Sequence, residues 1–328
     1  MPLAGGPLAF TAIEWLERGP GADISRRVLD LGHLRRWSEG SSQRQAVAAK
    51  LDLLSRRRQP FAGLALDRPL VMGVINVTPD SFSDGGDLAD GAAAIGRGLA
   101  MLDAGADILD IGGESTRPGS DPVSPELESA RILPVVRALA ERGAVVSVDT
   151  RRRGVMAAAI DAGARIVNDV TALREPGAIA CVARTGACAV LMHMLGEPGT
   201  MQADPRYADA ALDIHGFLQE RVAACVTAGI SLDRLAVDPG IGFGKTVAHN
   251  VELLDQFALF HGLGAAVLLG ASRKSFIARL SHDEAPKDRL PGSLAAALRG
   301  LAQGAQILRV HDVAETLQAL KVWRADAR

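Results

Sequence analysis

Aromatic side chains are scarce in this sequence, at 4% of 328 residues, and neither sign of charge is in clear excess. Proteins that bind nucleic acid commonly stack bases on aromatic rings and neutralise phosphates with surplus lysine and arginine. Here 36 basic and 38 acidic residues give a formal net charge of −2. We therefore do not expect nucleic acid as the main partner.

Cysteine is also rare, and Cys181, Cys188 and Cys225 form no CxxC pair. An odd, scattered set favours reduced and mostly buried thiols over a disulfide framework. The sequence has no apolar run of the roughly 20 residues that a membrane-spanning helix needs, and no secretory signal is apparent at its start. We therefore expect a cytoplasmic protein without a membrane partner.

The first 60 residues differ from the rest and predict an N-terminal, partly helical extension. Residues 41–58 are typical of a helix, with serines available as the N-cap and three arginines at 56–58 to suit the C-terminal end of the dipole. Four apolar residues fall at helical spacing along it: Ala46, Val47, Leu51 and Leu54. We expect this helix to pack on a main domain at 61–328; a basic docking surface is the alternative.

From residue 70 onward, short apolar runs alternate with longer segments of helical period. We count eight runs, at 71–76, 107–113, 144–149, 165–169, 188–193, 235–238, 266–270 and 306–310. Helices are expected between them, at 89–104, 125–142, 154–162, 207–228, 251–260 and 292–303. Doubly wound sheets alternate in the same way, but the count and even spacing favour a (β/α)8 barrel, the TIM barrel, of class α/β.

Almost every run ends in polar side chains, which a barrel of this kind would gather on one face. They are Asn76, Glu114, Ser115, Thr116, Arg117, Asp149, Asn168, Asp169, His193, Asp238, Arg273, Lys274, Ser275, Arg309 and His311. Taken singly, each is more often a helix cap, a structural histidine or a solvated lysine. Their recurrence at successive run ends is what predicts an active site.

These side chains sort by chemistry into three sets. The cations and donors suit an anion such as phosphate or pyrophosphate: Arg117, Lys274, Arg309 and His311. Asp149, Asn168 and Asp238 suit a flat heterocycle with several N–H groups, because a carboxylate pairs well with such an edge. Asn76 and Asp84 offer hard oxygens of the kind that Mg²⁺ uses together with substrate phosphate.

The string PGIGFGKT at 239–246 resembles a phosphate-binding P-loop without matching it. That pattern needs glycine, four further residues and then Gly-Lys-Thr, but position 239 is proline. We interpret the string as a flexible loop after Asp238, with Phe243 available as an apolar wall.

Between Leu70 and Val322 the chain closely resembles the dihydropteroate synthase family. The resemblance depends on strings that occur in order: NVTPDSFSDGG at 76–86, GGESTRPGS at 112–120, SVDT at 147–150, NDV at 168–170, LMHMLGEPGTMQ at 191–202, VDPGIGFGK at 237–245, SRKSF at 272–276 and RVHDV at 309–313. The family is a TIM barrel that joins 6-hydroxymethyl-7,8-dihydropterin pyrophosphate to p-aminobenzoate. The resemblance also implies Mg²⁺ as cofactor and a homodimer.

The resemblance further implies a role for each matching residue. The pterin would be held by Asp149, Asn168, Asp238 and Lys274, with Arg273 stacked over it. The pyrophosphate would be held by Asn76, Thr116, Arg117, Arg309 and His311, and Asn76 would also bind the metal. Pro118, Phe243 and Ser275 would form the p-aminobenzoate pocket, and the loop with Asp84 would close over the site. The catalytic set would be Asp84, Arg117, Lys274, Arg309 and His311.

Two other functions remain open from the sequence. A pterin-binding methyltransferase would share the pterin acceptors but would need no pyrophosphate site, and so would not require Thr116, Arg117, Arg309 and His311. A non-catalytic paralogue that binds pterin or a partner protein is the second alternative, and the intact charged set disfavours it.

Overall fold

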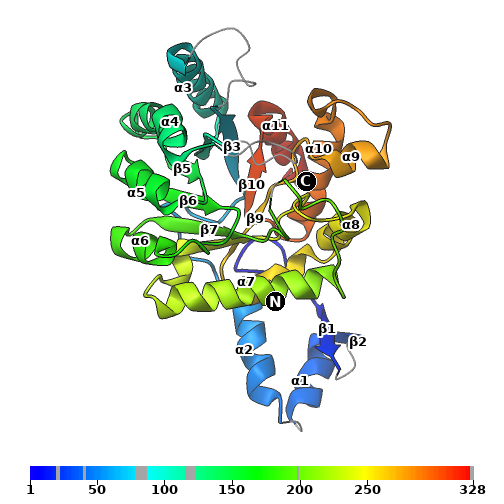
Figure 1. Cartoon of the computed structure of the whole chain (residues 1–328). Coiled ribbons are helices and arrows are strands. Elements are labelled where there is room, and N and C mark those ends of the chain that lie inside the picture. The colour runs from blue at the N-terminus through cyan, green and yellow to red at the C-terminus, as the bar shows by residue number, and fades with distance from the viewer. Residues whose placement is uncertain (20–22, 40–41, 78–86, 115–122, 198, 326–328) are drawn as a thin grey trace.

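A closed barrel of eight parallel strands forms the centre of the computed structural model, which describes residues 1–19, 23–39, 42–77, 87–114, 123–197 and 199–325 (Figure 1). Around the barrel the strands follow the order β10-β3-β4-β5-β6-β7-β8-β9. They are β3 (Leu70–Asn76), β4 (Ile108–Gly112), β5 (Val146–Asp149), β6 (Ile166–Asp169), β7 (Cys188–Met192), β8 (Leu235–Asp238), β9 (Ala266–Leu269) and β10 (Ile307–Val310). All eight predicted runs are strands, and the (β/α)8 prediction is confirmed.

Helices surround the barrel and connect its strands (Figure 1). They are α3 (Asp87–Ala104), α4 (Pro125–Ala140), α5 (Arg153–Asp161), α6 (Ala178–Thr185), α7 (Ala210–Thr227), α8 (Val247–Asp255), α9 (Ser275–Leu280), α10 (Leu290–Ala302) and α11 (Val313–Trp323). The helix predicted at 251–260 is divided, because α8 ends at Asp255 and the 3-10 helix η3 (Phe257–Leu263) follows it. Sequence analysis missed α6, α9 and α11, and two short 3-10 helices, η2 (Leu232–Arg234) and η4 (Pro286–Asp288), complete this part of the fold.

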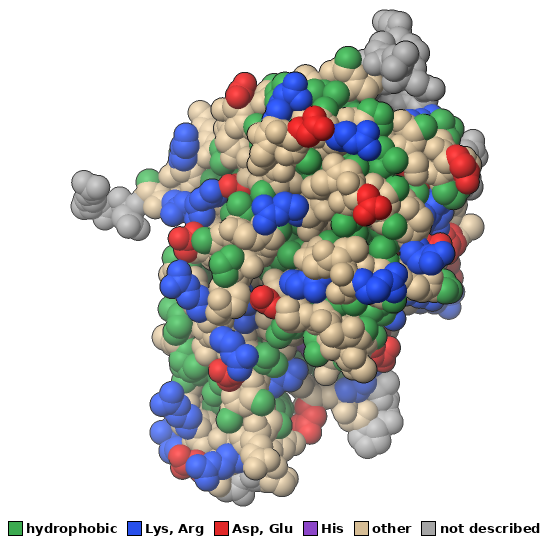
Figure 2. Space-filling view, turned by 90° about the vertical axis from the view of Figure 1, so that its left-hand side faces the viewer, with side chains coloured by type: hydrophobic (Ala, Val, Ile, Leu, Met, Phe, Trp, Pro, Cys, Tyr) green, Lys and Arg blue, Asp and Glu red, His purple; other side chains and the backbone are tan. Residues whose placement is uncertain are grey.

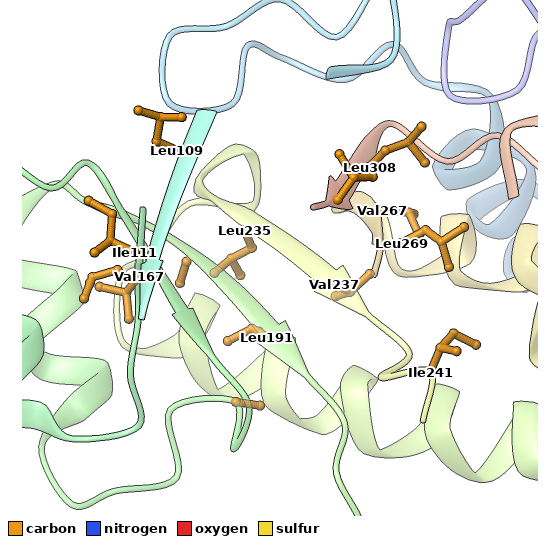
Figure 3. Close-up of a cluster of buried hydrophobic side chains, with 14 of the residues drawn as sticks. Leu109, Ile111, Val167, Leu191, Leu235, Val237, Ile241, Val267, Leu269 and Leu308 are labelled. Carbon is orange, nitrogen blue, oxygen red and sulfur yellow. The ribbon is translucent and has the colours of Figure 1, made fainter. Parts of the chain in front are cut away.

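Alternate residues along each strand face opposite sides of the barrel wall. One set packs outward against the helices, and Figure 3 shows members of it such as Leu109 and Ile111 on β4 and Leu308 on β10. The other set points into the barrel and fills the part of its interior away from the carboxyl ends of the strands, which we call the lower part. Its apolar side chains are Leu70, Met72, Ile108, Ile166, Cys188, Val190, Ala236, Ala266, Leu268 and Ile307. Phe61, fully buried, belongs to the same cluster. The barrel is therefore a packed core with no pore at this level.

The N-terminal extension contains two strands that sequence analysis missed. β1 (Ala12–Arg18) pairs antiparallel with β2 (Ile24–Asp30), and the helices α1 (Leu31–Glu39) and α2 (Arg44–Ser55) follow. In Figure 1 these elements extend below α7, to one side of the barrel. The strands were missed because charged residues interrupt their apolar alternation, as in AIEWLER and ISRRVLD.

The helix predicted at 41–58 is shorter than expected, and its predicted ends are wrong. α2 has Gln43 as its N-cap with no side-chain capping bond, and it ends at Ser55 before the three arginines. Arg58 turns inward instead and is only 9% exposed. Its guanidinium donates to the backbone oxygens of His261 at 2.9 Å and Ala265 at 3.2 Å. It therefore stabilises carbonyls at the C-terminal end of η3.

Basic and acidic side chains are interspersed with hydrophobic ones over the face shown in Figure 2. Among the described residues, no helix has both the length and the apolar character that crossing a lipid bilayer requires. The three cysteines are buried and unpaired, as the sequence predicts.

Candidate active site

Side chains from four strands meet around Arg309, at the carboxyl end of the barrel. Arg309, on β10, donates through Nε to Asp110 Oδ2 at 2.6 Å and through Nη2 to Asp149 Oδ2 at 2.7 Å. Asn168, on β6, donates through Nδ2 to the same Asp110 oxygen at 3.1 Å. Three of the predicted residues are thus brought together, although the sequence placed Arg309 and Asp149 in different sets.

Asp110 is the group that sequence analysis missed. It lies on β4, is fully buried, and has one oxygen, Oδ1, with no hydrogen-bond partner within the described parts of the chain. Ile108 and Asp110 share the inward face of β4 because they are two residues apart. A carboxylate at an inward position of an apolar strand is the sequence signal that marks it, and this position lies before the end of the strand.

This cluster concentrates charge away from water. Burial raises the pKa of Asp149 to about 7, and the nearby Arg309 partly opposes that rise. Burial lowers the pKa of Arg309, but the carboxylates of Asp110 and Asp149 outweigh this effect and raise it above its ordinary value. Arg309 is therefore a permanent cation held in a fixed orientation by two carboxyl groups.

Asp238 and Lys274 form a second charged group on β8 and at the start of α9. Asp238 is 4% exposed, and its Oδ1 accepts the backbone N–H of Gly240 at 2.7 Å. Burial raises the pKa of Asp238, while the Gly240 bond and Lys274 oppose that shift. Burial also lowers the pKa of Lys274 to about 7, with Asp238 opposing. The Lys274 ammonium lies 3.8 Å from the centre of the Phe243 ring. The ring therefore makes a cation–π contact with this second charged group.

The loop at 239–246 is closely packed, and the expectation that it would be flexible is wrong. Lys245 is 3% exposed; its ammonium donates to the Phe243 carbonyl at 2.9 Å and lies 3.1 Å from Nδ1 of His193. Burial lowers the pKa of both Lys245 and His193. Gly240 has a φ of 70°, and a Cβ there would lie 1.9 Å from the His193 carbonyl oxygen. Close packing explains this glycine without any phosphate.

His311 and Arg273 lie at the rim. The backbone N–H of His311 donates to Ser272 Oγ at 3.2 Å, and Nδ1 of the ring lies 3.1 Å from the same oxygen. Burial, with Arg309 and Arg273 adding to it, lowers the pKa of His311 to about 3, so the ring is neutral at pH 7. Arg273 pairs with Asp312, the N-cap of α11, through Nε at 3.0 Å. Its guanidinium therefore faces Asp312 here, while Ser275 begins α9.

Five of the predicted site residues lie outside the described parts of the chain: Asp84, Ser115, Thr116, Arg117 and Pro118. Asn76 is described and ends β3, where it pairs with Gly112 of β4. The described residues contain no group of three acidic, histidine or cysteine side chains that could hold a metal ion. One amide oxygen fits Mg²⁺ only when other ligands come from elsewhere, and Mg²⁺ is commonly held in this way together with substrate phosphate.

Comparison with known proteins identifies the family. The pterin binding enzyme family matches residues 72–311. Dihydropteroate synthase of Escherichia coli strain K12 is 48% identical over 263 residues, which cover 80% of this chain and 93% of the relative. The enzyme of the same name from Neisseria meningitidis serogroup B is 48% identical over 270 residues, covering 80% and 94%.

Solved structures agree with the sequence relatives. Dihydropteroate synthase of Xanthomonas albilineans with 4-aminobenzoic acid has a TM-score of 0.76 at 50% identity, covering 81% of this chain and 97% of that one. The same enzyme in complex with 7,8-dihydropteroate has a TM-score of 0.73 at 47% identity, covering 80% and 94%. The barrel, the charged cluster at its mouth and these relatives lead to one conclusion: the chain belongs to the pterin-binding enzyme family, as a dihydropteroate synthase.

Proposed function

We propose that the chain joins 6-hydroxymethyl-7,8-dihydropterin pyrophosphate to p-aminobenzoate, giving 7,8-dihydropteroate and pyrophosphate, and that the residues at the barrel mouth bind the two substrates. The observation that carries this proposal is the position of Arg309. Its ion pairs with Asp110 and Asp149 bring a fixed cation next to carboxylates at the barrel mouth. A molecule with a flat polar ring and an anionic leaving group suits both halves of that arrangement.

The pterin ring is assigned to Asp149, Asn168, Asp238 and Lys274. Asp238 is almost fully buried, and only one of its oxygens has a described hydrogen bond, from Gly240. An edge with adjacent N–H groups would satisfy the other oxygen and repay the cost of burying the carboxylate. Arg273 is assigned to the rim above the ring, and to stack there its guanidinium would need to leave Asp312.

The pyrophosphate is assigned to Arg309, His311 and Asn76, together with Thr116 and Arg117. Because the His311 ring is neutral, we assign it the role of a hydrogen-bond donor; Arg309 supplies the charge. Asn76 would hold Mg²⁺, and when bound the ion would neutralise charge on the leaving pyrophosphate. Asp84 is assigned to the loop that closes over the site.

The proposed reaction breaks the bond between the pterin methylene carbon and the pyrophosphate oxygen, with the electron pair leaving on pyrophosphate. The amine of p-aminobenzoate then attacks that carbon and releases one proton to water. The electron-rich pterin stabilises the carbocation left behind. Groups oriented toward the leaving charge supply the largest part of the rate enhancement, and holding the amine against the carbon supplies more. The amine is already neutral near pH 7, so no strong general base is required.

The p-aminobenzoate pocket is assigned to Phe243, Ser275 and Pro118. Phe243 packs against a cluster made of Val170, Met192, Met194 and Met201, and it lies under the Lys274 ammonium. This arrangement offers an apolar face for the aromatic ring next to the pterin site. Ser275, directly after Lys274, is assigned to the carboxylate of p-aminobenzoate.

We further propose a homodimer through α8, α9 and α10, in the cytoplasm, with residues 1–60 as an extension of the barrel domain. A groove of about 320 Å³ lies between these helices, and Leu280 beside it is 59% exposed. A second copy that covered this groove would remove the apolar surface from water. The three buried, unpaired cysteines suit a reducing compartment.

The test is release of pyrophosphate from purified protein supplied with the pterin pyrophosphate, Mg²⁺ and p-aminobenzoate. We expect release that requires p-aminobenzoate and stops with a metal chelator. Turnover without p-aminobenzoate dependence, or none at all, would contradict the proposal. Methyl transfer from a methylated folate, or pterin binding without turnover, would instead favour one of the two alternatives.

A further inference from the structure

We propose that the N-terminal extension positions the wall of the p-aminobenzoate pocket by way of two ion pairs to the start of α7. This inference depends on the proposed function, which assigns Phe243 to that wall. It gives the β1–β2 hairpin, which lies outside the region that the family matches, a part in substrate recognition.

The hairpin contacts α7 through one arginine from each strand. Nη2 of Arg18, the last residue of β1, lies 2.5 Å from Asp213 Oδ1. Nη2 of Arg26, on β2, lies 2.6 Å from Asp209 Oδ2. Asp209 is the N-cap of α7 and Asp213 belongs to its first turn. Figure 1 shows the hairpin directly below α7.

The same carboxylates fix the backbone that leads into α7. Asp213 accepts from Arg18 at Oδ1 and from the backbone N–H of Ala208 at Oδ2, at 2.9 Å. Asp209 accepts from Arg26 at Oδ2 and from the backbone N–H of Leu212 at Oδ1, at 2.9 Å. Burial raises the pKa of Asp213, but Arg18 and the backbone amides outweigh this and lower it, so the carboxylate is charged at neutral pH.

The residue before Ala208 reaches the substrate loop. Tyr207 donates its hydroxyl to the Gly244 carbonyl at 2.8 Å, and Gln202 donates its amide to the Gly242 carbonyl at 2.6 Å. These two bonds fall on either side of Phe243 in the sequence. The path from Arg18 to Phe243 is therefore continuous: an ion pair, a backbone hydrogen bond, one peptide unit and a tyrosine hydroxyl.

Two features limit how much the ion pairs can change substrate binding, and they predict a larger change for p-aminobenzoate than for the pterin. Asn250 and Lys245 also hold the loop, so the extension is one of several supports. Three of the four groups assigned to the pterin, Asp149, Asn168 and Asp238, belong to barrel strands, and the fourth, Lys274, contacts Phe243. Loss of the ion pairs should therefore affect p-aminobenzoate more than the pterin.

The test compares the double variant Arg18→Ala/Arg26→Ala with Arg27→Ala, in the full chain. Arg27 neighbours Arg26 on β2 and makes no ion pair within the described residues, so it is a matched control. We expect the double variant to raise the KM for p-aminobenzoate about two- to fivefold. The KM for the pterin pyrophosphate and the kcat should both equal those of Arg27→Ala. The rise in the KM for p-aminobenzoate should become smaller in concentrated salt, because salt screens ion pairs. Arg18→Lys/Arg26→Lys should bring the KM for p-aminobenzoate most of the way back to the wild-type value.

A KM for p-aminobenzoate equal to that of Arg27→Ala would overturn the inference. An equal rise in both KM values would overturn it as well, because the effect would then not be specific to p-aminobenzoate. A general loss of folded protein would instead lower the apparent kcat and leave both KM values unchanged. Phe243→Ala tests the premise separately. If that variant keeps the wild-type KM for p-aminobenzoate, the assigned pocket is wrong; if it raises the KM while the arginine variants do not, the pocket stands and only the positioning role fails.

Discussion

The lower and upper parts of the barrel interior are built from the same strands but carry opposite chemistry. On β4 the lower residue is Ile108 and the upper one, two positions on, is Asp110; on β10 they are Ile307 and Arg309. The lower layer packs apolar side chains together with Phe61, while charged side chains of the upper layer form ion pairs with each other. A step of two residues along one strand thus separates groups expected to determine stability from groups expected to determine activity.

Removing the Phe61 ring from the lower layer should give the largest effect, and this effect should fall on stability alone. Phe61→Ala deletes a fully buried aromatic side chain and should lower the free energy of unfolding by about 3–5 kcal/mol. Urea unfolding measures this, and kcat per folded molecule should be unchanged. A selective loss of kcat in folded protein would break the division between the two layers.

Replacing Arg309 with the apolar Met should have the largest effect on turnover. It removes the fixed cation, and kcat should fall about 10²- to 10³-fold while pterin affinity changes much less. Single-turnover kinetics with a separate pterin binding measurement can distinguish the two. Ile307→Val, one inward position below, is the matched control and should leave kcat near wild type. Equal losses from both variants would contradict the comparison.

Replacing Asp110 with Asn tests the group that supports Arg309. The change keeps the shape but replaces one of the two carboxyl groups that orient the guanidinium with a neutral amide, so kcat/KM should fall about 10- to 100-fold. Steady-state kinetics measure this, with Ile108→Val as the control on the same strand. Wild-type kcat/KM in the Asn variant would show that Asp149 alone orients Arg309.

Asp149 should make stability depend on pH, with the smallest effect of the four. Burial raises its pKa in the folded protein from 3.8 to about 7, so the folded state holds more protons than the unfolded state between these values. Stability from this group is therefore lost as the pH rises through that window. Between pH 4 and 7 the wild type should therefore lose stability relative to Asp149→Asn. Parallel pH profiles of unfolding in the two proteins would contradict this.

The barrel was predictable because buried parallel strands are continuous apolar runs, and eight of them recur between helical segments. The upper layer was only partly predictable. Asp149 and Asp238 end their strands and Asn168 lies one residue before the end of β6, so all three could be identified. Asp110 lies inside an apolar run, where only its inward-facing position distinguishes it. Lys245 was misread because a glycine-rich string suggests mobility, and its burial depends on His193, 52 residues away in sequence. Pairs such as Arg18 with Asp213 leave no local signal.

Arg309 also pairs with residues that are synthesised much earlier than itself. It belongs to the last strand, yet its partners Asp110 and Asp149 belong to the second and third strands of the barrel. A ribosome therefore makes both carboxylates long before the cation that neutralises them, and β3 and β9 stay without their shared neighbour until β10 emerges. Completion of the active site and closure of the sheet are thus the same event in biosynthesis.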